Sequence, residues 1–130
     1  MKVSELKHLI LDQMAQLVVF DRAGTLLESC HALVDLRAFI GCSLYERYPL
    51  LDSLKEVLQN LSSSSLPLSL PGVDFSFEGR WGYYDFELFV HPEHPNKLVW
   101  ILLDNTALYR YFRPIQQERN EMLADQERLT

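Results

Sequence analysis

The first part of the chain alternates between helix-like and strand-like patterns. Apolar residues recur at helical spacing over residues 4–14, which predicts an amphipathic N-terminal helix. The β-branched and aromatic run at 17–20 and the run at 25–30 predict two strands. Between them, Asp21 suits a side chain that caps a turn and Gly24 supplies a positive φ, so the two strands are expected to form a hairpin.

Residues 33–61 change to a helical pattern. Leu36, Phe39 and Ile40 fall on one helical face that Gly41 ends, and Ser43 is expected to begin a second short helix. A third helix is predicted over 52–61, capped by Asp52 or Ser53, with an apolar stripe of Leu54, Val57, Leu58 and Leu61. The serine run at 62–65 and the prolines that follow predict an exposed loop.

The part of residues 1–105 that follows this loop has the two-residue period of strands. Alternation over 73–77 and 84–90 predicts two strands with one buried face each, joined by a turn at 79–82. The run at 98–103 is apolar on both faces, as in a central strand covered on both sides. The sequence therefore predicts an α+β fold: a five-stranded antiparallel sheet with two N-terminal strands, a helical middle and a three-stranded C-terminal meander.

Composition narrows the classes of function. The net charge is −6 and the 12 basic residues are scattered, so no basic stripe is available for nucleic acid. Glu5 and Lys7 interrupt any signal-peptide core and no apolar run is long enough to span a bilayer, which favours a cytoplasmic protein without a membrane segment. Cys30 and Cys42 are expected to be free thiols buried as small hydrophobic residues.

Three segments resemble one family. LVVFDRAGTLLES (17–29) is similar to the opening hairpin of PAS domains, FIGCSLYERYPLL (39–51) to the segment that follows it there, and the stretch from Leu103 to the exit from their last strand into a signalling helix. The resemblance implies a PAS-type sensory module like the input domains of histidine kinases in two-component systems. It also implies that Asp104, Asn105 and Thr106 form the signal linker, with Asn105 or Thr106 capping the outgoing helix.

The tail, 106–130, is expected to be a linker and coiled-coil helix cut before an output domain. Its apolar residues lie seven apart, which predicts one seam of a homodimer; they are Leu108, Ile115, Met122 and Leu129. A surface helix without a partner explains the same spacing. Pro114 interrupts this stretch, so the helix either starts near Arg113 after a short capped turn or is a single helix kinked at Pro114.

A pocket lined by apolar and aromatic side chains is the remaining candidate for ligand binding. Its expected residues are Phe39, Tyr45, Phe86, Leu88, Trp100 and Leu102. They suit a small apolar or aromatic ligand, but they equally suit a filled core. No cofactor is predicted, since residues 33–61 lack a histidine for haem and the cysteine motif of the flavin-binding members of the family is missing.

Catalytic chemistry has little support in the sequence. His91 and His94 with Glu93 could face a metal, but no further ligands are spaced to close a site, and Asp85 and Glu87 are expected on a solvated strand face. The chain is therefore expected to be a sensing and dimerisation module that passes a ligand- or partner-induced change to an output domain. A constitutive interaction module with a filled core is the alternative, and a small enzyme using Asp85, Glu87 or His91 is the weaker rival.

Overall fold

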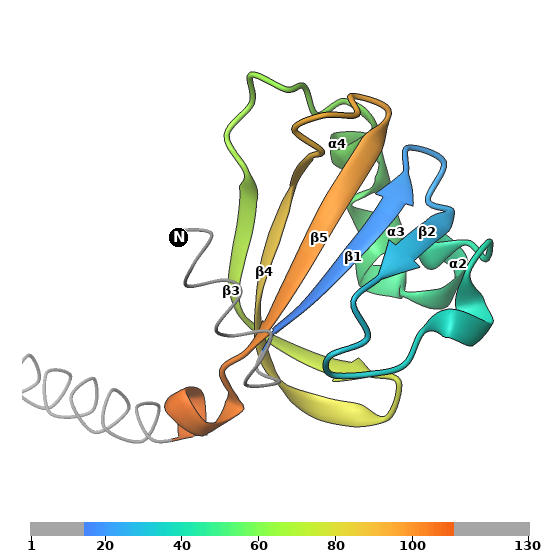
Figure 1. The fold of residues 1–130 in the computed structure, drawn as a ribbon. Coiled ribbons are helices and arrows are strands. Elements are labelled where there is room, and N and C mark those ends of the chain that lie inside the picture. Colours follow the sequence, from blue (N-terminus) through green and yellow to red (C-terminus); the bar gives the residue numbers. More distant parts are fainter. Residues whose placement is uncertain (1–14, 111–130) are drawn as a thin grey trace, which may run out of the picture.

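The computed structural model describes residues 15–110, which fold around one antiparallel sheet (Figure 1). Its strands are β1 (Ala15–Asp21), β2 (Leu26–Ser29), β3 (Leu68–Phe77), β4 (Arg80–Val90) and β5 (Lys97–Asp104), in the spatial order β2-β1-β5-β4-β3. The predicted α+β class and strand succession are confirmed. The helices expected over 4–14 and beyond residue 110 lie outside the described residues.

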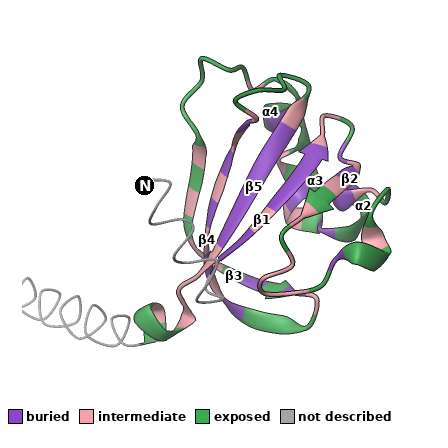
Figure 2. Cartoon of the chain, viewed as in Figure 1, coloured by how far each residue is buried: buried purple, intermediate pink, exposed green. Residues whose placement is uncertain are grey.

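The central strand β5 organises the core. Leu98 to Leu102 are all buried, as the run of apolar residues predicts for a strand covered on both faces (Figure 2). The larger cluster lies on the side of the helices and includes Trp100, while Val19, Val99 and Ile101 form a smaller cluster on the other face. The sheet therefore has a helix-side face and an outer face, and residues alternate between them along each strand.

The β1–β2 hairpin forms as predicted. The Asp21 carboxylate accepts the backbone N–H of Thr25 at 2.9 Å, and Gly24 has a φ of 91°. A Cβ atom at Gly24 would lie 2.3 Å from the ring of Tyr45. Glycine is therefore required here both by the backbone conformation and by the aromatic ring packed against the turn.

The helical middle is more broken than its apolar spacing suggests. It consists of a 3-10 turn η1 (Arg37–Phe39) and three short helices, α2 (Leu44–Arg47), α3 (Pro49–Ser53) and α4 (Lys55–Gln59). Ser43 caps α2 by accepting the N–H of Glu46, which confirms the predicted start. These helices cover the side of the sheet that carries the larger cluster (Figure 1).

The helix expected over 33–40 is wrong. The fully buried side chain of Gln16 accepts the backbone N–H groups of Leu33 and Val34 and donates to the carbonyl of Val34. These bonds tie the segment, which is bent at 32–34, to β1, so its backbone groups have partners outside a helix. Only η1 remains helical, and Ile40 is left 46% exposed.

The third helix also differs from the prediction. It begins at Pro49, whose fixed φ suits a first helical position, and it is interrupted at Leu54. Neither Asp52 nor Ser53 caps it. Of the predicted stripe, Leu58 is fully buried and Leu54 and Leu61 pack against the larger cluster, whereas Val57 is half exposed.

The strand β3 starts earlier than the serine and proline pattern indicates. It begins at Leu68, and the ladder to β4 shifts between Leu70 and Val73, so Pro71 lies in an irregularity of an edge strand where its missing N–H is tolerated. The turn to β4 is Glu78-Gly79, with φ of 52° and 84°, and not the predicted 79–82. Arg80 and Trp81 already belong to β4.

The structure also bears on two predictions made from composition, one about the cysteines and one about membrane-spanning segments. Cys30 and Cys42 are free thiols, but both are exposed, so the expectation that they are buried is wrong. None of the helices within residues 15–110 is both long and apolar enough to cross a bilayer.

Candidate functional site

The six residues predicted to line a pocket come together in the larger core cluster. Tyr45, Phe86, Leu88, Trp100 and Leu102 are buried members of it, and Phe39 packs against it while partly exposed. The ring centroids of Phe86 and Trp100 are 5.3 Å apart and nearly perpendicular, which is a favourable edge-to-face contact. These side chains pack directly against one another, and a ligand pocket among them stays a prediction.

Trp100 has one unusual feature. Its side chain is fully buried, yet its indole N–H has no hydrogen-bond partner among the described residues. A buried donor without an acceptor costs about 1–3 kcal/mol, and such groups are rare in folded proteins. Tyr48, Phe75 and Phe77 lie around this indole, with ring centroids 5.5 to 6.1 Å from it.

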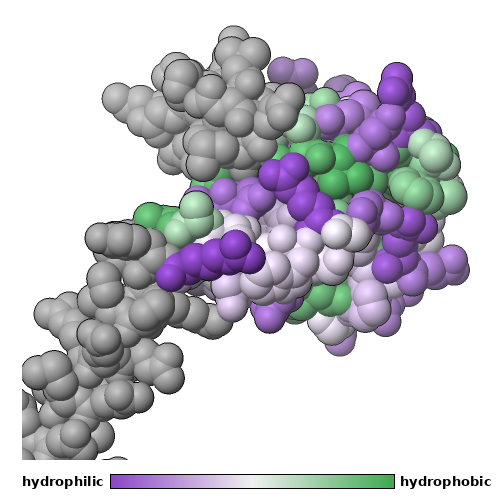
Figure 3. All heavy atoms as spheres, turned by 90° about the horizontal axis from the view of Figure 1, so that it is seen from below, coloured by the Kyte–Doolittle hydropathy of each residue, from purple (hydrophilic) through white to green (hydrophobic). Residues whose placement is uncertain are grey.

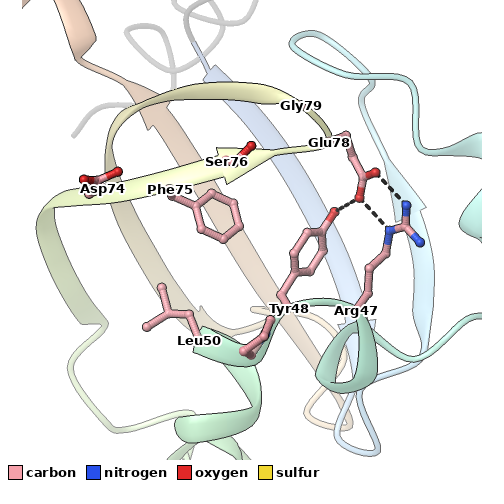
Figure 4. Close-up of a pocket in the computed structure, with 9 residues that line it drawn as sticks. Arg47, Tyr48, Leu50, Asp74, Phe75, Ser76, Glu78 and Gly79 are labelled. Carbon is pink, nitrogen blue, oxygen red and sulfur yellow. Dashed lines mark hydrogen bonds and ion pairs between the residues drawn. The ribbon is translucent and has the colours of Figure 1, made fainter.

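A groove opens beside this aromatic cluster, between the edge strand β3 and the helices α2 and α3 (Figure 4). Its volume is about 550 Å³. It is lined by Arg47, Tyr48, Pro49, Leu50, Asp74, Phe75, Ser76, Glu78 and Gly79. None of the six predicted pocket residues lines it. Tyr48 and Phe75 form part of both the groove and the core.

An ion-pair cluster closes one end of the groove. Arg47 donates two hydrogen bonds to the carboxylate of Glu78, at 2.5 and 2.6 Å, and the Tyr48 hydroxyl donates a third at 2.6 Å (Figure 4). The Arg47 guanidinium also lies 3.6 Å from the ring centre of Phe39. The cluster thereby joins the helical middle to the β3–β4 turn.

The electrostatics of the cluster follow from these contacts. The hydrogen bonds from the Arg47 guanidinium hold the pKa of the Glu78 carboxyl below its usual value, despite partial burial. Burial, together with the hydrogen bond to Glu78, raises the pKa of the Tyr48 hydroxyl. At neutral pH Glu78 is therefore charged and Tyr48 is a neutral donor. Sequence analysis missed this cluster because its partners are 31 residues apart and have no common motif.

The predicted signal linker forms a network at the end of β5. The Asp104 carboxylate accepts from the Arg80 guanidinium on β4 at 3.1 Å and from the backbone N–H of Thr106 at 3.0 Å. The Thr106 hydroxyl also donates to Asp104 and accepts the backbone N–H of Tyr83 at 3.1 Å. Partial burial raises the pKa of Asp104, but the bonds from Thr106 and Arg80 outweigh it and leave the pKa lowered.

The outgoing helix starts at this network. Residues 106–110 are helical, and the N–H of Tyr109 bonds to the carbonyl of Asn105. Asn105 takes the expected N-cap position, but its side chain binds Asp85, and the side chain that accepts an N–H of the first turn is that of Asp104. Pro114 lies outside the described residues, so the two forms of the helix are not distinguished.

Asp85 is a second junction, which sequence analysis assigned to a solvated strand face. One carboxylate oxygen accepts the backbone N–H of Gly72 at 2.8 Å and the Tyr109 hydroxyl at 2.9 Å. The other accepts the side-chain amide of Asn105 at 2.6 Å. Asp85 thus connects the irregularity of β3 to the linker and to the helix, and both of its carboxylate oxygens are engaged in these contacts.

The predicted dimer seam is described only at its first residue. Leu108 is half exposed, while Ile115, Met122 and Leu129 lie outside the described residues. Seen from below, the side from which the chain leaves is a mosaic in which small hydrophobic patches alternate with polar residues (Figure 3). Dimerisation through this seam stays a prediction.

The other candidate residues for metal binding or catalysis are not grouped into a site within the part of the chain that the structure describes. Within residues 15–110 no three His, Cys, Asp or Glu side chains are grouped to hold a metal ion. The rings of His91 and His94 lie against each other in the β4–β5 loop, and His91 accepts the backbone N–H of Glu93. Glu87 accepts the hydroxyl of Ser69 on β3.

This architecture is also found in solved structures of other proteins. No protein-family model matches the chain, and no curated protein has a significantly similar sequence. Several solved structures match this fold, and two of them illustrate the likeness at low sequence identity. One, from an HTR-like protein of Haloarcula marismortui, is 19% identical, with a TM-score of 0.55 over 78% of this chain and 95% of that one. The other, from BvgS of Bordetella pertussis, is 16% identical, with a TM-score of 0.52 over 88% and 98%.

Proposed function

We propose that this chain, which has the fold of a PAS domain, is a signal-sensing module that passes a change in its sheet to the helix that follows. Both similar structures are described as PAS domains. The module works without catalysis of its own, as a homodimer joined to an output domain such as a histidine kinase. The change that the module transmits to the output domain is a change in the position of the outgoing helix.

The junction between β4 and the start of that helix supports this proposal most directly. Four residues of the linker and helix are bonded to β4: Asp104 to Arg80, Thr106 to Tyr83, and both Asn105 and Tyr109 to Asp85. These bonds fix the first helical turn to β4. A displacement of β4 relative to β5 therefore changes the direction of the helix.

Hydrogen exchange tests the junction in the chain as it is. Asp104→Ala and Thr106→Ala should each speed exchange at the amides of 106–109 and leave the amides of β1 and β5 protected. Asp35→Ala is the matched control, because Asp35 also pairs with an arginine and accepts a backbone N–H, but it lies at the surface far from the linker in sequence. Unchanged exchange in both linker variants would contradict the proposal.

We further infer that the sensed signal is a small apolar or aromatic molecule with a hydrogen-bond acceptor. The unpaired indole N–H of Trp100 favours such a molecule, since the acceptor would satisfy a buried donor. The close contacts among Phe75, Phe86 and Trp100 favour the alternative, a constitutive interaction module with a filled core.

Native mass spectrometry of the chain purified from cells separates these two functions. A dimer that carries a small molecule, lost in Trp100→Phe, would support sensing. A dimer of unmodified chains only, with no molecule retained or taken up from a library of small aromatic compounds, would support the constitutive module. A monomer at micromolar concentrations would contradict the dimer in both.

A further inference from the structure

We infer that the groove between β3 and α3 binds an extended, basic peptide segment of a partner protein, which adds a strand to the open edge of β3. The inference rests on three features of the described residues: the main-chain groups along this edge, the side chains that line the groove, and their charges. It does not depend on ligand sensing in the core.

The open edge carries unpaired main-chain groups in the groove. β3 is the last strand of the sheet order, so its second edge has no neighbouring strand within residues 15–110. The two-residue turn makes Phe77 and Arg80 a hydrogen-bonded pair, and the bonded pairs alternate from there along an antiparallel ladder. Asp74 and Ser76 are the intervening residues, so their N–H and C=O groups point to the open edge. Both residues line the groove.

The groove lets a strand approach this edge. Its regular edge, from Val73 to Phe77, corresponds to about 13–17 Å of extended chain, enough for four or five paired residues. The Arg47–Glu78 pair closes the end at the turn, and the irregularity at Pro71 and Gly72 interrupts the edge at the other end. A partner strand is thereby limited to a short segment, which is a common way to prevent long edge-to-edge pairing.

The side chains predict which residues the segment carries. Phe75 points into the groove toward Tyr48 and Leu50, so a residue opposite Phe75 meets an apolar surface (Figure 4). Residues opposite Asp74 and Ser76 point to the outer face, beside the exposed Asp74 carboxylate, which accepts the indole N–H of Trp81 at 2.6 Å and keeps its charge. The segment therefore alternates between apolar residues and residues that face Asp74.

The charges select a basic segment. Arg47 is the one cation among the lining residues, and it is bound to Glu78, so Asp74 leaves the groove with a net negative charge. The net charge of −6 for the whole chain acts in the same direction. Lysine or arginine is therefore expected at the positions opposite Asp74 and Ser76.

Synthetic peptides of alternating lysine and valine, blocked at both ends and six residues long, provide the probe. Backbone NMR should show shifts at the amides of Asp74 and Ser76 and none in α4. Replacing every lysine by glutamate should weaken binding by about tenfold at low salt. Equal binding of the two peptides, or shifts confined to other surfaces, would overturn the inference.

Methylation of peptide amides gives a sharper test of strand addition. In an antiparallel segment the lysines are opposite Asp74 and Ser76, so their N–H groups face β3 while those of the valines face away. N-methylation of the lysine amides should abolish binding, and N-methylation of the valine amides should leave it within about threefold. Equal effects of the two modifications would exclude pairing with the edge.

Two variants of the chain complement the peptides. Ser76→Pro removes the N–H that faces the edge without removing a ladder bond, and it should abolish binding, whereas Ser76→Ala keeps that N–H and should bind like the original chain. Thermal unfolding shows whether Ser76→Pro remains folded; the methylated peptides test the same bond with the chain unaltered. If no peptide binds and Ser76→Pro dissociates a dimer, the edge pairs with a second copy and the inference is wrong.

Discussion

Replacing Glu78 by glutamine tests whether the cluster at the end of the groove holds the helical middle to the sheet. The variant removes the negative charge and keeps an oxygen that can accept from Tyr48. In the structure this carboxylate receives two bonds from Arg47 and one from Tyr48. Glu78→Gln should therefore destabilise the fold mainly by weakening the ion pair.

The magnitude follows from the burial of the two partners. Exposed ion pairs contribute about 0.2–1 kcal/mol, and breaking a buried pair costs about 3–5 kcal/mol. The Glu78 side chain is 18% exposed and that of Arg47 is 35% exposed, so solvent screens this pair in part. We expect a loss of about 1.5 kcal/mol, which lowers a urea midpoint by roughly 1 M for a domain of this size.

The pH dependence identifies the charge as the cause. The pKa of Glu78 is lowered in the folded state from its usual 4.5, so its stabilisation is present above pH 4.5 and is lost as the pH falls through the folded-state pKa. Urea unfolding of the original chain and of Glu78→Gln should therefore differ at pH 7. The two chains should converge under more acidic conditions.

A double-mutant cycle with Arg47→Gln completes the test. If the pair is the cause, the two substitutions together should cost clearly less than the sum of the single costs. Asp35→Asn is the control, since its arginine pair is exposed on both sides and should leave the midpoint unchanged. A change below about 0.3 kcal/mol in Glu78→Gln, or costs that simply add, would refute a structural role for the cluster.

Three glycines give two further predictions, each measured by urea unfolding. Gly24→Ala should cost about 3 kcal/mol or more, since its φ of 91° and the Tyr45 ring both oppose a Cβ; Gly41→Ala, with a φ of 88° and open space, should cost only about 1 kcal/mol. Gly82→Ala should cost about 1–3 kcal/mol, because the Cβ would overlap the Thr106 hydroxyl, and Thr106→Ala in the same chain should reduce that cost. Equal costs of Gly24→Ala and Gly41→Ala, or additive costs of Gly82→Ala and Thr106→Ala, would contradict these contacts.

The strand framework was predictable because its signals are local. Alternation along β4 placed Tyr84, Phe86, Leu88 and Val90 on one buried face, and all four are buried. The doubly apolar run of β5 identified the central strand. Turn chemistry also acts over a few residues, which is why the hairpin at Asp21 was found.

The helical middle was less predictable because partners distant in sequence determine it. Gln16 binds the backbone at 33–34 and prevents a helix that apolar spacing favours. The helix that starts at Pro49 is likewise placed by Tyr48, whose hydroxyl binds Glu78 across the groove. Neither interaction has a sequence motif, so hydrophobic periodicity alone overestimates the helices.

In the candidate site, too, features with local sequence signals were predictable and features that depend on distant partners were not. The linker 104–106 was predicted from a local resemblance. In the structure Asp104 and Thr106 bind each other and Asn105 binds Asp85, while the transmission of a signal through them stays a prediction. Asp85 was assigned to a solvated face because it alternates outward on β4. Its role depends on Gly72 and Tyr109, 13 and 24 residues away, and only the assembled sheet brings these groups together.

The edge strand β3 is held at both ends by these two junctions. At the turn, Glu78 binds Arg47 and Tyr48 of the helical middle; at the irregularity, Gly72 binds Asp85, which also holds the outgoing helix through Tyr109. A strand added between them would straighten or shift β3 against fixed ends. Its binding energy would therefore act on the bond from Gly72 to Asp85, and through Asp85 on the helix. Peptide binding should thus change hydrogen exchange at 106–109 in the original chain. Asp85→Asn, which weakens this connection, should reduce that change, and because the coupling is reciprocal it should strengthen the binding of the peptide or leave it unweakened.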